Sequence, residues 1–298
     1  MIGTIILIIT AVYSITMARR HWDVLVSEKK TLMVELGIEL LFLGFLVIVY
    51  GRLWMLKEAG IWESLVLFVA ALLIFYEMYL AFKKARSIKE RSMELLEALI
   101  CVMEAGDPNL DGHSLHVHNI VNVFYDYLPP AYQNQLNLEN LKYASLFIDM
   151  GKLGIPRSIL TKAGKLTKEE MELMRRHPEI CVKILSPVAS FSSISDWILY
   201  HHERVDGKGY HGLKGGEIPL ASRIIAIADT YSALTMDRTY KASLSYNEAI
   251  TEIRQAAGTQ LDEELVGYFC EIPMHRLDEC FAYVRRIMER YQDEHFGE

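Results

Sequence analysis

The chain lacks paired cysteines. Its four cysteines are scattered along the sequence, and no CxxC pair occurs. A disulfide framework is therefore not expected, which is typical of a protein in a reducing compartment. We interpret the cysteine side chains as small apolar packing groups. They are Cys101, Cys181, Cys270 and Cys280.

Positive charge is also scarce. The 298 residues include 31 lysines and arginines against 38 aspartates and glutamates, which gives a net charge of −7. A duplex nucleic acid is not expected as a partner, because such binding depends mainly on basic residues that contact phosphates. A small anionic ligand is still compatible with this composition, since a few local basic side chains can bind it.

No alternating strand pattern competes with the helical signals after the N-terminal region. The run from Thr167 to Glu170 is a capping box, and it predicts a helix that continues to His177, where Pro178 interrupts it. Pro219 is expected to open another helix. Further helical patterns cover residues 112–128, 138–150, 193–203, 246–257 and 277–291. We therefore predict an all-α fold.

Long apolar segments are concentrated in the first 82 residues. Three of them, at about 2–18, 32–50 and 61–82, approach the roughly 20 residues that cross a bilayer. Lysines and arginines cluster after the first and third segments, which predicts that those ends lie on the cytoplasmic side of the membrane. We therefore predict an integral protein of the bacterial inner-membrane type. It would have its N-terminus outside, a three-helix transmembrane region at 1–82 that contacts membrane lipids, and a cytoplasmic domain.

Residues 83–105 connect these segments to the predicted domain, which spans 93–298. Their apolar side chains fall on one helical stripe, formed by Ile88, Leu95, Leu99 and Val102. The stripe has two interpretations: a signalling helix that pairs two copies, or the first helix of the domain packed on its core. The first interpretation implies a homodimer through the transmembrane and linker helices, although the stripe is too short to predict a coiled coil.

Histidines and aspartates recur at the ends of predicted helices and within one apolar helix. A single histidine at a helix end is ordinary, because the helix dipole favours it there. Together, however, four imidazoles and two carboxylates form a mixed nitrogen and oxygen set that suits two transition metals such as iron or manganese. Such a metal pair can bind a phosphate and activate a water. The six residues are His113, Asp149, His177, His201, His202 and Asp229.

Several long tracts resemble those of one family. They include DMGKLGIPRSILTKAGKLTKEE, YHHERVDGKGY and GLKGGEIPLASRIIAIADTYSALTMDRTYK, in the family's order. Over about residues 93–268 the chain resembles the HD-GYP branch of the HD phosphohydrolase superfamily. The resemblance implies an HD-type helical bundle that hydrolyses cyclic dimeric GMP at a centre of two or three metals. It also places the six residues at metal-ligand positions, with Asp149 bridging the metals.

The same resemblance implies roles in substrate binding and catalysis. Lys152 matches a lysine beside the metals, which could hold a phosphate oxygen or assist the leaving group, and it is the catalytic candidate together with Asp149. Arg238 and Lys241 match positions expected to meet the phosphates of the ligand. Tyr210 could stack on a guanine.

One position departs from the ligand pattern. Ile148 stands where the family has the histidine of its His-Asp pair. Isoleucine offers no lone pair, so we expect the metal held by His113, Asp149 and Asp229 to be bound more weakly. His116, one turn after His113, is a candidate replacement ligand.

Two further departures bear on the metal count and the loop. Asn109 stands where some members carry a glutamate ligand, so a third metal is not expected. His211 replaces the proline of the Gly-Tyr-Pro motif. We therefore expect two divalent transition metals, iron or manganese, with one site weakened.

Three functions are compatible with these motifs. The first is a membrane-bound metal phosphodiesterase that hydrolyses cyclic dimeric GMP with reduced or altered activity. The second is a catalytically degenerate receptor that binds the dinucleotide or a partner protein. The third is an HD-type phosphohydrolase that acts on another nucleotide. The retained ligand set and Lys152 favour the enzyme.

Overall fold

The computed structural model describes residues 51, 69, 76, 79–80, 83–84, 86–87, 91, 95–100, 104, 112–162, 164–236 and 243–296. The chain divides into two compact units, Met1–Leu95 and Leu96–Glu298. The second unit carries the candidate site. The predicted boundaries at 1–82, 83–105 and 93–298, and the predicted homodimer, stay predictions.

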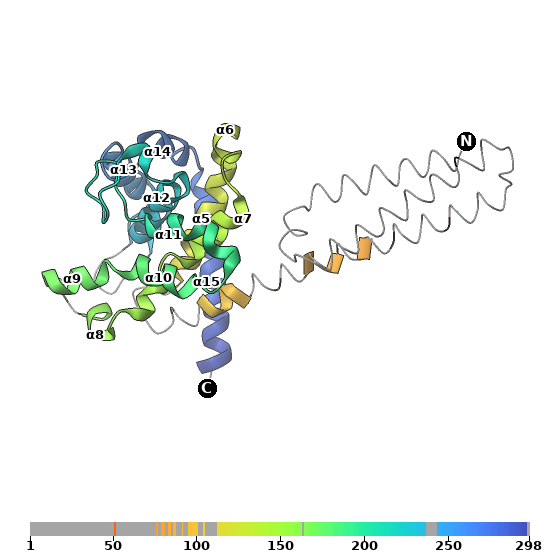
Figure 1. The fold of residues 1–298 in the computed structure, drawn as a ribbon, viewed down its shortest axis with the longest axis horizontal. Coiled ribbons are helices and arrows are strands. Elements are labelled where there is room, and N and C mark those ends of the chain that lie inside the picture. Colours follow the sequence, from red (N-terminus) through yellow and green to blue (C-terminus); the bar gives the residue numbers. More distant parts are fainter. Residues whose placement is uncertain are drawn as a thin grey trace. The chain divides into compact units, whose positions relative to one another are not determined.

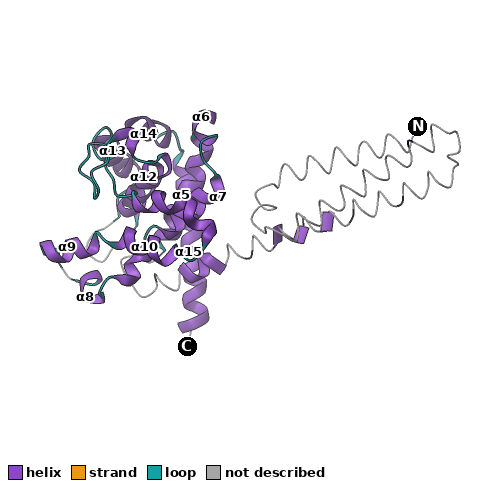
Figure 2. Ribbon diagram, viewed as in Figure 1, coloured by secondary structure: helices purple, strands orange, loops and turns teal. Residues whose placement is uncertain are grey.

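The described residues of the second unit form helices joined by turns and loops (Figures 1 and 2). Residues 96–100 and Glu104 are helical and precede the named elements. The first half contains α5 (His113–Tyr127), α6 (Pro130–Gln133), α7 (Leu138–Phe147), η1 (Met150–Gly154), α8 (Arg157–Leu160), α9 (Lys168–Met174) and α10 (His177–Leu185). The second half contains η2 (Ala189–Ile194), α11 (Ser195–Leu199), η3 (Gly215–Glu217), α12 (Leu220–Thr235), α13 (Tyr246–Ala256), α14 (Glu263–Phe269) and α15 (Met274–Phe296). The prediction of an all-helical fold is confirmed for this unit.

Helix α5 lies at the centre of the unit, where it packs against α7, α12 and α15 (Figure 1). Its sequence is apolar on several faces, as expected of a helix surrounded by others. Leu115, Ile120 and Phe124 are completely buried, and each such side chain stabilises the fold by roughly 1.5–3 kcal/mol. The core therefore fixes the helix that begins with His113.

Side-chain caps define several helix starts. Thr167 and Glu170 form the predicted capping box of α9, in which each side chain bonds the backbone of the other residue. Ser245 and Glu248 form the same box on α13. The predicted end of the Thr167 helix is wrong, because α9 stops at Met174 and His177 begins the next helix. Proline is tolerated in the first turn of a helix, where its missing N–H is not needed, so Pro178 follows His177 without interrupting α10.

The predictions of a three-helix transmembrane region and of an inner-membrane location are not upheld. Within the described ranges, no helix is both long enough and apolar enough to cross a bilayer. The 23 residues of α15 are long enough to cross a bilayer, but Arg276, Asp278, Arg285 and Glu289 are spread along it, and charges are costly in hydrocarbon. The three predicted segments, at about 2–18, 32–50 and 61–82, lie almost entirely outside the described residues.

Candidate metal centre

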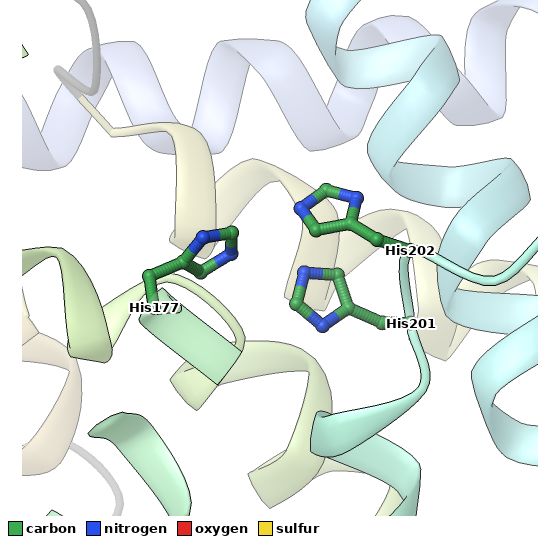
Figure 3. Close-up of side chains that lie close together, drawn as sticks. All are labelled: His177, His201 and His202. Atoms are coloured by element: carbon green, nitrogen blue, oxygen red, sulfur yellow. The ribbon is translucent and has the colours of Figure 1, made fainter. Parts of the chain in front are cut away.

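Three histidines from two parts of the fold converge on one point (Figure 3). His177 is the first residue of α10, and His201 and His202 lie in the turn after α11. One ring nitrogen of each lies within 4.8 Å of one nitrogen of the others, an arrangement that could hold a metal ion. The helices α10 and α11 pack together, which brings residues distant in sequence to the same place.

Backbone carbonyls fix which nitrogen two of these rings present. The Nδ1 of His177 donates to the carbonyl oxygen of Met174 at 2.8 Å, and the Nδ1 of His201 donates to that of Ile198 at 2.6 Å. A carbonyl only accepts, so each Nδ1 carries the proton and each Nε2 carries a lone pair. Both Nε2 atoms are buried without a hydrogen-bond partner. Buried polar atoms are rarely left unpaired, so this donor set fits a metal ion.

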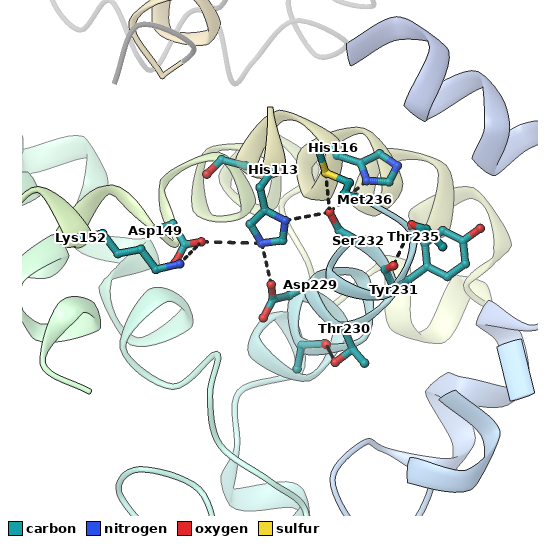
Figure 4. A network of polar contacts seen from close by, with 12 residues as sticks. His113, His116, Asp149, Lys152, Asp229, Thr230, Tyr231, Ser232, Thr235 and Met236 are labelled. Carbon is teal, nitrogen blue, oxygen red and sulfur yellow. Dashed lines mark hydrogen bonds and ion pairs between the residues drawn. The ribbon is translucent and has the colours of Figure 1, made fainter. Parts of the chain in front are cut away.

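Figure 4 shows a second cluster, which contains His113, Asp149 and Asp229. The Nε2 of His113 lies 2.9 Å from Oδ1 of Asp229 on α12 and 3.7 Å from Oδ2 of Asp149. The other carboxylate oxygen of Asp149, Oδ1, lies 3.6 Å from Nε2 of His177. Asp149 therefore faces one histidine of each cluster, as a ligand shared by two metals would.

Lys152 completes the surroundings of Asp149. Its Nζ lies 2.8 Å from Oδ2 of Asp149, three residues earlier in the chain. Burial opposes ionisation of Asp149, but Lys152, His177 and His113 outweigh it and hold the pKa of the carboxyl well below its usual range. In the same way, a hydrogen bond from His113 lowers the pKa of Asp229 despite its burial. Both carboxylates are therefore charged at neutral pH and available to cations.

Burial keeps the imidazoles neutral. Desolvation lowers the pKa of His177 to about 4, and it also lowers the pKa values of His201 and His202. A neutral imidazole is the form that binds a metal. The three rings therefore need not release a proton at neutral pH before they can act as ligands.

Ser232 orients the ring of His113 through Nδ1, the nitrogen that does not face Asp229 and Asp149. The Nδ1 of His113 and the Nδ1 of His116 both lie 2.9 Å from the hydroxyl oxygen of Ser232 (Figure 4). His116 packs edge-on against Phe281, and its buried Nε2 has no hydrogen-bond partner. His116 is thus placed behind His113 rather than among the six candidate ligands.

The 3-10 helix η1 sets the distance between Asp149 and His177. It packs directly on α10. A Cβ on Gly151 would overlap the carbonyl oxygen of His177 and lie 2.7 Å from the backbone nitrogen of Cys181. Glycine is therefore required here for the two elements to approach this closely.

The loop after His202 is held by Glu203. This buried carboxylate accepts from the backbone N–H groups of His211 at 2.6 Å and of Leu213 at 2.7 Å. Gly209 passes so close that a Cβ would lie 2.5 Å from the Cα of Glu203. The loop is therefore fixed beside the histidine cluster, although the sequence pattern predicted only a glycine-rich loop.

Tyr210 lies on this loop with its ring against His202, at 4.8 Å between centroids. The guanidinium carbon of Arg175 lies 5.2 Å from the centroid of the Tyr210 ring, which is typical of a cation–π contact. Arg175 is exposed and follows α9, two residues before His177. It adds a cation beside the site that the sequence motifs did not indicate.

The remaining site predictions have different outcomes. Ile148, at the end of α7, is completely buried in the apolar core. Arg238 and Lys241 lie outside the described residues. Ser232, Glu203 and Arg175 were missed by sequence reasoning. A glutamate directly after two site histidines was a signal for Glu203. Ser232 gave no such signal, because its partners are distant in the sequence.

The fold and the site together define an all-helical domain with histidine and aspartate side chains gathered at helix ends around a candidate metal centre. The chain belongs to the HD domain family, whose match covers residues 80–265 and so more than half of the chain. The resemblance recognised from the motifs is thereby confirmed at the level of this family.

Several relatives carry functional names. A cyclic di-GMP phosphodiesterase of Vibrio cholerae is 36% identical over 59% of this chain and 38% of its own length. The cyclic di-GMP phosphodiesterase response regulator RpfG of Xanthomonas campestris is 34% identical over 60% of this chain and 47% of its length. A 3'3'-cGAMP-specific phosphodiesterase 3 of Vibrio cholerae is 27% identical over 80% of this chain and 52% of its length. The chain thus spans about half, or less, of the length of these relatives.

Proposed function

We propose that the chain is a metal-dependent phosphodiesterase that hydrolyses a cyclic dinucleotide, with cyclic dimeric GMP as the substrate. The observation that carries the proposal is the position of Asp149 between two clusters of candidate ligands, with Lys152 bonded to it at 2.8 Å. Relatives named as cyclic dinucleotide phosphodiesterases support the same reaction class.

Two divalent transition metals, iron or manganese, would be held by the six candidate ligands. One would lie between His177, His201, His202 and Asp149, and the other would lie next to His113, Asp149 and Asp229. The unpartnered Nε2 atoms of His177 and His201 support the first position. When bound, such a pair of metals supplies charge for the phosphate oxygens and lowers the pKa of water.

The side chains around the centre would bind and orient the phosphodiester. Lys152 would stabilise the negative charge that develops on the phosphate, because its ammonium group already lies next to Asp149. Arg238 and Lys241 would contact the phosphates. Tyr210 would contact a base, with its ring held by His202 and Arg175.

Catalysis would be reduced by Ile148. The metal beside His113 would have one protein ligand fewer, and loss of even an outer-sphere partner commonly costs roughly 10–100-fold in metal affinity or activity. Ile148 directly precedes Asp149 and offers no donor atom, so it cannot replace the missing ligand. The alternative function, a receptor that binds the dinucleotide without hydrolysing it, is also based on the missing ligand at Ile148.

The test uses the full chain, stripped of metal and reloaded with Mn²⁺, or with Fe²⁺ under anaerobic conditions. Chromatography would follow cyclic dimeric GMP and, in parallel, 3'3'-cGAMP. We expect slow, metal-dependent opening of cyclic dimeric GMP. In Ile148→His we expect tighter Mn²⁺ binding at the second position and at least a tenfold faster reaction.

Ile148→Val is the matched control, since it keeps the side chain apolar and should leave both quantities near those of the wild type. Dinucleotide binding without turnover, in the wild type and in Ile148→His alike, would favour the receptor and contradict the enzyme. Faster hydrolysis of 3'3'-cGAMP than of cyclic dimeric GMP would contradict the proposed substrate.

A further inference from the structure

A buried carboxylate outside the candidate ligand set lies close to the metal centre. Glu104 is only 4% exposed. One of its oxygens, Oε1, accepts from the backbone N–H of Ser114 at 2.9 Å, whereas the other, Oε2, is buried without a partner. A buried carboxyl group is costly, and burial raises the pKa of Glu104 to about 7. The cost of burying this carboxyl group raises the question of what it contributes to the fold or to the site.

The hydrogen bond from Ser114 falls in the first turn of α5. The first N–H groups of a helix have no partner within the helix, and side-chain caps normally bind them. At α5 the cap position is Gly112, which has a φ of 74° and no side chain to offer. A Cβ there would overlap the Val284 side chain of α15. Glu104 supplies from ten residues upstream the acceptor that Gly112 cannot provide.

This acceptor fixes the start of α5, where His113 is the first residue. The Nε2 of His113 must stay close to Asp229, at 2.9 Å, and to Asp149, at 3.7 Å. A small rotation of the first turn would move this nitrogen out of the cluster. Glu104 also interacts electrostatically with His113 and Asp149.

We propose that Glu104 is a positioning residue for the metal centre. It caps α5 and thereby holds His113 at the candidate ligand position. The inference rests on the proposed role of His113 as a metal ligand. Glu104 acts through the backbone of Ser114 and is not itself one of the ligands.

The segment that carries Glu104 is itself anchored in the domain. Ile100 is buried, and Glu97 accepts a hydrogen bond from the Tyr283 hydroxyl of α15 at 3.2 Å. Glu97 also lies 3.9 Å from Nε2 of His118 on α5. Residues 97, 100 and 104 are spaced by three and four, as on one face of a helix. The carboxyl group of Glu104 is therefore presented from a support that is itself fixed to α5 and α15.

The test compares Glu104→Leu and Glu104→Gln in the full chain. Leucine removes the acceptor, whereas the amide oxygen of glutamine can still accept from Ser114. The first readout is amide hydrogen exchange of residues 113–119 in the metal-free protein, and the second is the dissociation constant for Mn²⁺. We expect Glu104→Leu to speed exchange and to weaken Mn²⁺ binding at least tenfold, and Glu104→Gln to keep exchange close to the wild type.

Glu248→Leu is the matched control, because Glu248 accepts from the backbone N–H of Ser245 at the start of α13, and it should leave the exchange of residues 113–119 and Mn²⁺ binding unchanged. If Glu104→Leu does not fold, Glu104→Asp replaces it, because the shorter side chain withdraws the acceptor and keeps the charge. Unchanged exchange and Mn²⁺ affinity in the folded variant would overturn the proposal. Neither readout involves a dinucleotide, so a failure of turnover would contradict the proposed function alone.

Discussion

Ser232 is hydrogen-bonded to two imidazoles, His113 and His116, each at 2.9 Å. Its single hydroxyl proton can go to His116 or to the sulfur of Met236, which lies at 3.4 Å. For His113 to offer Nε2 to a metal, its Nδ1 must be protonated and donate to Ser232. Ser232 can accept from that tautomer of His113, whereas for His177 and His201 a backbone carbonyl, which only accepts, fixes the tautomer.

Ser232→Ala should weaken Mn²⁺ binding beside His113 by roughly 10–100-fold, because partners of this kind orient metal ligands. Calorimetric titration of the metal-free chain would measure it. Ser222→Ala is the control, since Ser222 is also buried on α12 but donates to the carbonyl of Trp197. Equal Mn²⁺ affinities in the two variants would contradict the role of Ser232.

The candidate ligands could be predicted from the sequence, because their residue types and the tracts around them are local features. Their partners could not. Ser232 lies 119 residues from His113 in the chain, and Glu104 meets Ser114 through a backbone N–H that any residue except proline would provide. Contacts of this kind depend on packing, which a single sequence does not reveal.

At the level of elements, the contact between η1 and α10 joins the two clusters. Asp149 precedes η1 and His177 begins α10, so the separation of these elements fixes the 3.6 Å between the two side chains. The capping box of α9 was predictable from Thr167 and Glu170. The helix start at His177 was not, because a proline in the first turn and one that ends a helix look alike in sequence.

Gly151→Ala should push η1 away from α10. We expect a loss of roughly 1–3 kcal/mol of stability, as for other overpacked contacts, together with weaker Mn²⁺ binding because Asp149 moves from His177. Urea unfolding and Mn²⁺ titration would measure the two effects. Gly216→Ala should change neither, since no atom lies within 4 Å of the added Cβ. Wild-type behaviour of Gly151→Ala would show that the elements need not be this close.

At the level of the whole molecule, the second unit buries several imidazoles in their neutral form. Desolvation lowers the pKa of His116 to about 3 and those of His118 and His177 to about 4, and it also lowers those of His201 and His202. The all-helical class was predictable from helical periodicity and caps. The central position of α5, which buries His116 and His118, was not, because periodicity does not say which helix the others surround.

These imidazoles predict acid sensitivity of the metal-free protein. Between about pH 6.5 and 4, His116, His118 and His177 are neutral in the folded domain and protonated in the unfolded chain, so stability falls as the pH falls. Each contributes up to about 1.4 kcal/mol per pH unit. Glu104, with its pKa raised to about 7, acts in the opposite direction but is a single group.

Urea unfolding at a series of pH values would measure this slope. His118→Gln should make it shallower, because one buried imidazole that makes a hydrogen bond to the Lys142 carbonyl away from the site is removed. A stability that is flat from about pH 6.5 to 4.5 would contradict the burial of these groups in neutral form.

The two Nε2 atoms left unpaired at His177 and His201 also bear on how the protein must be handled. A preformed group of imidazoles binds nickel, copper or zinc more tightly than manganese or iron, following the Irving–Williams order. Chromatography on a nickel resin, or expression in zinc-rich medium, would therefore fill the centre with a foreign ion. The metal found in a freshly purified sample would then depend on which ions the protein met during expression and purification. Inactivity of such a sample would not show that the protein with its native metal is inactive.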